Sequence, residues 1–154
     1  MYERILVPVD GSATSKRGLD EAVRLAKLTN ATIKLLHVVD ELIFATGFET
    51  GATYSNVVLP LLKEGGERIL AEARERVAAA QVPVETLLVD NIGARTAEVV
   101  VEQADAWKAD VIVLGTHGRR GVTRFMLGSD AEQILRIATV PVLLVRLPAA
   151  VRTS

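Results

Sequence analysis

Five short aliphatic runs, each separated from the next by a stretch with helical spacing, constrain the fold of this chain more than any other feature. Each run is 4–8 residues long, which is the length of a buried strand. The runs are Ile5 to Val9, Thr32 to Val39, Val84 to Val89, Val111 to Leu114 and Val142 to Val145. Strands that alternate with helices form right-handed crossovers. The pattern therefore predicts an α/β fold: a doubly wound, five-stranded parallel sheet with helices on both faces.

Four stretches between the runs carry apolar residues at helical spacing. These helical faces are Leu19, Ala22, Val23 and Ala26; Val58, Leu62, Ile69, Ala73 and Val77; Val100, Ala104 and Trp107; and Ala131, Ile134, Leu135 and Ala138. Gly65 and Gly66 fall inside the second face and predict a bend or an interruption of that helix. Residues 1–147 are expected to form a single domain, followed by a frayed tail at 148–154. The weakly patterned segment Asp40 to Thr53 is a loop of a length that is often functional.

Composition and charge exclude several classes of function. The net charge of −1 argues against a general electrostatic grip on nucleic acid. The chain has no cysteine and two histidines, which argues against disulfides and a structural zinc site. No apolar run approaches the roughly 20 residues of a membrane span, and no signal peptide is visible. We therefore expect a cytoplasmic protein.

A glycine-rich segment follows the fourth run. It reads Gly115-Thr116-His117-Gly118-Arg119-Arg120-Gly121 and, after a short run, Gly128-Ser129-Asp130. In open parallel sheets, ligands bind beyond the carboxyl ends of the strands. Glycines let backbone N–H groups approach an anion, and a helix start near Ser129 suits phosphate. Arg119, Arg120 and Arg124 could neutralise a polyphosphate. Each piece also has a structural interpretation: turn glycines, solvated arginines, and a capping box from Ser129 to Glu132.

Three further polar residues have two interpretations each. Asp10 follows the first run and is either a turn residue that accepts backbone N–H bonds or a ligand contact at the expected edge. His37 lies within an apolar run and is interpreted as a core or edge histidine rather than a ligand. His117 either contacts phosphate or is solvated.

The glycine spacing resembles the nucleotide motif of ATP-binding universal stress proteins: Gly115, two residues, Gly118, nine residues, then Gly128-Ser129. The resemblance covers nearly the whole chain. The segments that carry it are Ile5 to Ser12, which resembles the family's first strand and turn, His37 to Asp40, which resembles the end of its second strand, and Thr139 to Val145, which resembles its closing strand. The fold implied by the resemblance is Rossmann-like and of the adenine-nucleotide-binding type.

The resemblance implies ATP as the ligand, with Mg²⁺ as an accompanying ion. It implies an adenine pocket lined by Pro8, Val9 and Val38. It implies that Asp10 contacts the ribose or a bound metal. The residues implied around the phosphates are Gly115, Gly118 and Gly128 by close approach, and Thr116, His117, Arg119, Ser129, Asp130 and Ala131. Asp130 departs from this scheme, because its charge suits a helix start but repels a triphosphate unless Mg²⁺ intervenes or the carboxylate turns outward.

The function implied is regulatory: nucleotide-dependent interaction during stress adaptation, with an unnamed protein partner. The resemblance also implies a homodimer that pairs through the closing strand, Val140 to Arg146, an apolar edge that invites pairing. One alternative is an enzyme with slow ATP hydrolysis. No catalytic residue is assigned, because the chain lacks a G-x-x-x-x-G-K-[ST] loop. Another alternative is a receiver-like switch phosphorylated at Asp90, although no acidic pair adjoins Asp10 and no lysine follows the last run.

Overall fold

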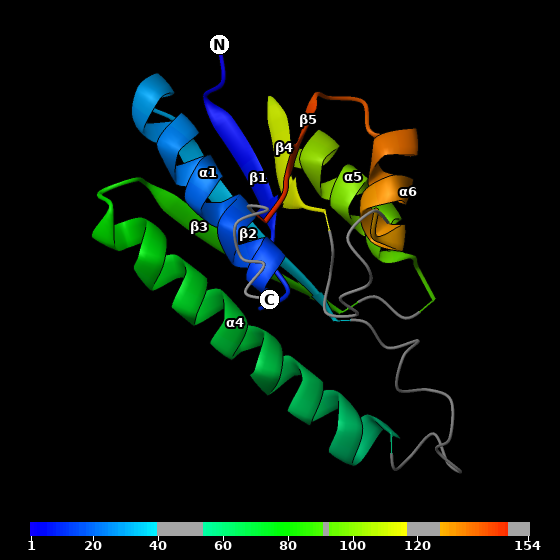
Figure 1. Cartoon of the computed structure of the whole chain (residues 1–154). Helices are drawn as coiled ribbons and strands as arrows, with labels where there is room; N and C mark the ends of the chain where they lie inside the picture. The colour runs from blue at the N-terminus through cyan, green and yellow to red at the C-terminus, as the bar shows by residue number, and fades with distance from the viewer. Residues whose placement is uncertain (40–53, 91–92, 117–126, 148–154) are drawn as a thin grey trace, which may run out of the picture.

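A computed structural model describes residues 1–39, 54–90, 93–116 and 127–147 (Figure 1). Five strands form one sheet, and every pairing in it is parallel. The strands are β1 (Arg4–Pro8), β2 (Thr32–Val39), β3 (Val84–Asp90), β4 (Val111–Gly115) and β5 (Val142–Val145). All five lie within one residue of the aliphatic runs, so the predicted strands and the predicted α/β class are confirmed.

The strand order in the sheet is β3-β2-β1-β4-β5. The chain therefore builds outward from β1 to β3 and then returns to add β4 and β5 on the other side of β1. Ile5 faces Ile33 of β2 on one side and Val111 of β4 on the other. The doubly wound prediction is confirmed, and the strand order reverses between β1 and β4.

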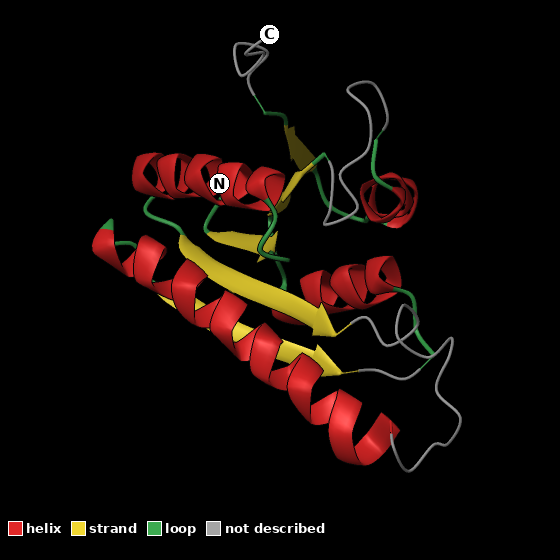
Figure 2. Ribbon diagram, turned by 60° about the horizontal axis from the view of Figure 1, so that its bottom comes forward, coloured by secondary structure: helices red, strands yellow, loops and turns green. Residues whose placement is uncertain are grey.

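The helices form two layers with the sheet between them (Figure 2). One layer contains α1 (Ala13–Thr29) and α4 (Leu59–Ala79), which a π-helical turn, Tyr54–Val58, precedes. The other layer contains α5 (Thr96–Trp107) and α6 (Ser129–Ile137). Among the described residues, no helix is both long and apolar enough to cross a membrane.

Each face of the sheet has its own core, because successive side chains of a strand point to opposite faces. Ile5 and Val7 pack with α1 and α4, whereas Leu6 between them packs with α5 and α6. The core is aliphatic on both sides. Trp107 lies partly buried against the second core, as its place on a predicted helical face suggested.

Helix α4 runs through Gly65 and Gly66 without a break over 21 residues. The predicted interruption is wrong. Gly66 is buried, and a Cβ placed on it would lie 2.6 Å from Cδ2 of His37 and 2.7 Å from Cδ1 of Leu88. The glycine is needed so that the helix backbone can pack directly on β2 and β3. The predicted loop Asp40 to Thr53 and the predicted tail 148–154 lie outside the described residues.

Candidate functional site

The carboxyl ends of β1 and β4 lie side by side where the strand order reverses, which is where open α/β sheets bind ligands. The first turns of α1 pack against the end of β4 at this point. A Cβ on Gly115 would lie 2.5 Å from the carbonyl oxygen of Thr14, and one on Gly18 would lie 3.1 Å from the amide nitrogen of Gly115. The glycine at 115 is therefore required by the packing of a helix on a strand end.

The turn after β1 is held by a small set of hydrogen bonds. The Val9 N–H donates to the Leu36 carbonyl at 2.8 Å, and the Asp10 N–H donates to Ser15 Oγ at 3.2 Å. Asp10 Oδ1 accepts the Ser12 N–H at 2.8 Å. The left-handed φ of Gly11, +82°, completes the turn. Asp10 thus has the turn role that was one of its two interpretations, and the turn places its carboxylate beside the start of α1.

The base of the glycine loop is closed by Thr116. Its N–H donates to the Val145 carbonyl at 3.1 Å, and its own carbonyl accepts the Gly128 N–H at 2.7 Å. The Glu132 N–H then bonds the Gly128 carbonyl at 2.9 Å, which makes Gly128 the N-cap of α6. The proposed capping box, with Ser129 as N-cap, is wrong, because Ser129 is already the first helical residue. The start of α6 is consequently tied to the end of β4.

The hydroxyl of Thr116 is buried and has no hydrogen-bond partner among the described residues. The residue is 6% exposed, and its Oγ1, like Nε of Arg17, is a buried polar atom that lacks a partner in the described ranges. Burying a hydroxyl without a partner is unfavourable by about 1–3 kcal/mol. A ligand bound at the carboxyl end of β4 could supply the hydrogen-bond partner that this hydroxyl lacks.

The structure brings together most of the predicted site residues that it describes. Pro8, Val9 and Asp10 lie at the end of β1, Gly115 and Thr116 lie at the end of β4, and the last group starts α6. That group is Gly128, Ser129, Asp130 and Ala131. Of the other four predicted residues, Val38 lies in β2, and His117, Gly118 and Arg119 lie outside the described residues.

Two of the predicted site residues, Val9 and Ala131, cannot contact a ligand through their side chains. The side chain of Val9 packs in the core beneath α1 and α4, whereas Val38 packs against the opposite core. These two side chains cannot line one cavity, so Val9 can reach a ligand near Val38 only through its backbone. Ala131 is 4% exposed and packs in the core under α6, so it also can offer only its backbone.

His37 is the contact that sequence reasoning missed. It is buried, as predicted, but its Nδ1 lies 2.8 Å from the Val9 carbonyl oxygen, at the edge of the site. A sequence signal did exist. A buried polar ring needs a hydrogen-bond partner, and the neighbouring strand ends close to this position.

Metal ligands are sparse in the part of the chain that the structure describes. No group of three or more His, Asp or Glu side chains there could hold an ion. Mg²⁺ does not require such a cage, because it is commonly held by one or two carboxylates together with substrate phosphates and water. Asp10 fits that donor set.

Asp90 ends β3 at the outer edge of the sheet and pairs with Lys63, with Nζ 2.6 Å from Oδ2. In a receiver-type sheet the third strand lies next to the first, in the order 2-1-3-4-5. Here β2 separates β3 from β1. The receiver interpretation of Asp90 is therefore not supported.

Comparison with known proteins decides the family. The universal stress protein family model matches residues 1–146. The chain belongs to the universal stress protein family. A universal stress protein of Methanocaldococcus jannaschii is 33% identical over 148 residues, which cover 96% of this chain and 84% of that protein.

Solved structures of the family share the fold. Universal stress protein UspA from Lactobacillus plantarum matches with a TM-score of 0.79 and 27% identity, over 94% of this chain and 98% of that one. A universal stress protein solved in complex with cAMP matches with a TM-score of 0.65 and 26% identity, over 94% and 97% of the two chains. The resemblance inferred from the glycine spacing and the strand segments is confirmed at the level of the family.

Proposed function

We propose that this universal stress protein binds ATP between the ends of β1 and β4 and the start of α6, as a regulatory protein. The observation that carries the proposal is Thr116. Its orphaned hydroxyl is buried at the switch point, while its backbone ties the base of the glycine loop to the N-terminus of α6. A helix N-terminus favours anions, and a nucleotide phosphate would supply the missing hydrogen-bond partner.

The proposed binding mode assigns roles by position. Pro8 and Val38 contact the adenine with their side chains, and Val9 contributes its backbone. Asp10 contacts the ribose or Mg²⁺. The phosphates lie against the glycine loop and the start of α6, which supply Gly115, Thr116, His117, Gly118, Arg119, Gly128, Ser129, Asp130 and Ala131. The related protein solved with cAMP supports an adenine nucleotide as the ligand class.

Mg²⁺ has a specific place in this proposal. Asp130 lies in the first turn of α6, where its charge suits the helix but opposes a triphosphate. A magnesium ion held by Asp10 and the phosphate oxygens would reduce that repulsion. Affinity for ATP should therefore rise when Mg²⁺ is added.

The biological role proposed is nucleotide-dependent interaction with a partner protein during stress adaptation, in the cytoplasm, by a homodimer. Binding rather than turnover is proposed because the chain has no G-x-x-x-x-G-K-[ST] loop to position a triphosphate for transfer. The nucleotide would then act as a ligand whose occupancy changes the surface offered to the partner.

Calorimetric titration with ATP and Mg²⁺ tests the proposal, after the purified protein has been checked for bound nucleotide. Four or five hydrogen bonds to charged groups, less the cost of association, correspond to a Kd of about 1 µM. Titrations with ADP, AMP and cAMP would define the preferred nucleotide. Failure of nucleotide-free protein to bind any of them would contradict the proposal.

The variant Thr116→Val removes the hydroxyl while keeping the shape of the side chain. Because the hydroxyl has no hydrogen-bond partner in the described part of the chain, the free energy of unfolding should stay the same or rise. ATP affinity should fall about tenfold, the value of one lost hydrogen bond to a charged group. Thr32→Val is the matched control. Thr32 is the first residue of β2, at the amino end of the strand and away from the site, so this variant should bind ATP normally. Unchanged affinity in Thr116→Val would place the phosphates elsewhere.

A further inference from the structure

His37 connects helix α4 to the backbone that carries Asp10. The side chain is 7% exposed, and its Nδ1 lies 2.8 Å from the Val9 carbonyl oxygen. A carbonyl oxygen can only accept a hydrogen bond, so Nδ1 must carry a proton and donate it. The contact crosses from β2 to the residue immediately after β1.

This contact continues the hydrogen bonding between β2 and the β1 segment beyond the last residue pair of the two strands. The last residue of β1, Pro8, pairs with Leu36. Beyond it, the Val9 N–H still bonds the Leu36 carbonyl at 2.8 Å, and the Val9 carbonyl bonds His37. Both backbone polar groups of Val9 are therefore fixed by β2. The next residue is Asp10, whose carboxylate holds the turn into α1.

The imidazole ring packs directly against the backbone of α4, because Gly66 has no side chain. A Cβ at that position would lie 2.6 Å from Cδ2 and 3.2 Å from Nε2 of His37. The helix backbone thus forms one wall of the ring's site. This wall limits the ring to an orientation in which Nδ1 reaches Val9, since interiors pack too tightly for the ring to shift freely.

We propose that His37 is a positioning residue of the nucleotide site: it fixes the Val9 carbonyl and thereby the turn that presents Asp10 and the start of α1. The ligand part of this proposal rests on the ATP-binding function proposed above. His37 itself is too deeply buried to be the ligand contact. Its effect on binding passes through the backbone of Val9.

Two substitutions separate positioning from simple core packing. His37→Leu keeps an apolar side chain but removes the donor, and ATP affinity should fall about tenfold. His37→Asn places an amide N–H close to where Nδ1 was, and affinity should return to within about threefold of the wild-type value. Val77→Ala, on the buried face of α4 itself, is the control for lost stability. It should bind ATP normally although it unfolds more easily.

Amide hydrogen exchange in nucleotide-free protein tests the turn independently of ATP. The Ser12 N–H, which bonds Asp10, should exchange faster in His37→Leu and normally in His37→Asn. The internal reference is the Ala109 N–H, which donates to the Ala104 carbonyl between the end of α5 and the start of β4. Unchanged exchange at Ser12, or unchanged ATP affinity in His37→Leu, would overturn the proposal. A wild-type protein that binds no nucleotide would overturn the proposed function alone, and the exchange comparison would still decide whether His37 holds the turn.

Discussion

Gly65 and Gly66 are neighbours in α4 with opposite surroundings. A Cβ on Gly65 would have nothing within 4 Å, whereas one on Gly66 would collide with His37 and Leu88. Both residues pay the same helix-propensity cost relative to alanine. Only at Gly66 is this cost offset by packing, because the close approach of α4 to the sheet depends on the absence of a side chain there.

Substitution of each glycine by alanine should therefore change stability in opposite directions. Gly65→Ala should raise the free energy of unfolding by about 0.5–1 kcal/mol, through backbone entropy and helix propensity. Gly66→Ala should lower it by about 1–2 kcal/mol, because the overpacking cost exceeds that gain. Urea unfolding of the two variants beside the wild type measures both values. A stabilised Gly66→Ala would show that α4 can move away from β2 and β3 at little cost.

Other residue roles show where sequence reasoning stops. Asp10 and Thr116 could be placed at the site, because residues just after parallel strands gather at one edge of the sheet. The burial of His37 could also be predicted. The divergence of Val9 from Val38 could not, since it depends on the register that pairs Pro8 with Leu36. Nor could the packing of Gly115 against Thr14, which depends on α1 crossing β4.

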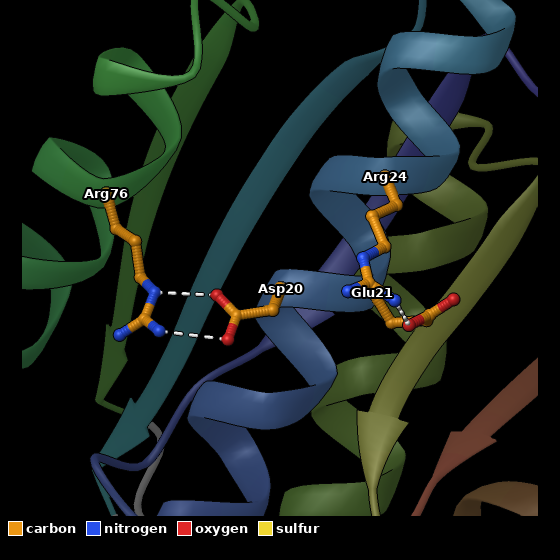
Figure 3. Close-up of polar contacts among 4 residues, drawn as sticks. All are labelled: Asp20, Glu21, Arg24 and Arg76. Carbon is orange, nitrogen blue, oxygen red and sulfur yellow. Dashed lines mark hydrogen bonds and ion pairs between the residues drawn. The ribbon is translucent and has the colours of Figure 1, made fainter.

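At the scale of elements, α1 and α4 lie in one layer and are joined by an ion pair between Asp20 and Arg76 (Figure 3). Arg76 donates from Nε to Oδ1 at 2.7 Å and from Nη2 to Oδ2 at 2.9 Å. This two-pronged geometry is the stronger form of the arginine–carboxylate contact. The pair Glu21 and Arg24, also drawn in Figure 3, lies within α1 and has a single contact of 3.5 Å.

Double-mutant cycles should rank these two pairs. Alanine substitutions at Asp20 and Arg76 should give a coupling energy of about 0.5–1 kcal/mol, the upper range for partly exposed pairs. The same cycle at Glu21 and Arg24 should give about 0.3 kcal/mol or less. Both values should shrink in 1 M salt, where the screening length is about 3 Å. Equal coupling in the two cycles would mean that the two-pronged contact between the helices is no stronger than the single contact within α1.

The elements themselves were largely predictable from the sequence. Each aliphatic run became a strand, because strands of a parallel sheet with helices on both faces read as nearly continuous apolar sequence. The exception was α4, where glycine propensity suggested an interruption. The helix persists because Leu70, Ala73 and Val77 are buried on its inner face. Such burial contributes about 1.5–3 kcal/mol for each large side chain, more than the glycines cost.

At the scale of the whole molecule, the order of the strands was the part that the sequence pattern left open. The predicted helices on both faces require one reversal of direction along the sheet, because right-handed crossovers that all run the same way place every helix on one face. The pattern does not fix where that reversal occurs; in the structure it follows β3, when the chain returns to add β4 beside β1. The return to β1 creates the switch point, so the location of the site is a property of the sheet and not of any single segment.

The same strand order leaves two edges with different chemistry. The outer strand β3 exposes Glu85 and Asp90, charges that discourage pairing with another sheet. The opposite edge, β5, exposes Leu143 by 39%, and Leu147 just beyond it by 43%. The adjoining helix α6 exposes Leu135 and Ile137 to a similar degree. The β5 edge is therefore the one suited to association with a second copy of the chain.

We predict that the wild-type protein is a dimer through β5 and that Leu143→Lys weakens it. A lysine at this position would bury an unpaired ammonium group in an apolar interface, which is strongly unfavourable. Light scattering at micromolar concentration should give twice the chain mass for the wild type and a lower mass for the variant. Leu28→Lys is the matched control, because Leu28 is 83% exposed near the end of α1 and should leave the dimer intact. A monomeric wild type, or equal masses for the two variants, would show that β5 is not the interface.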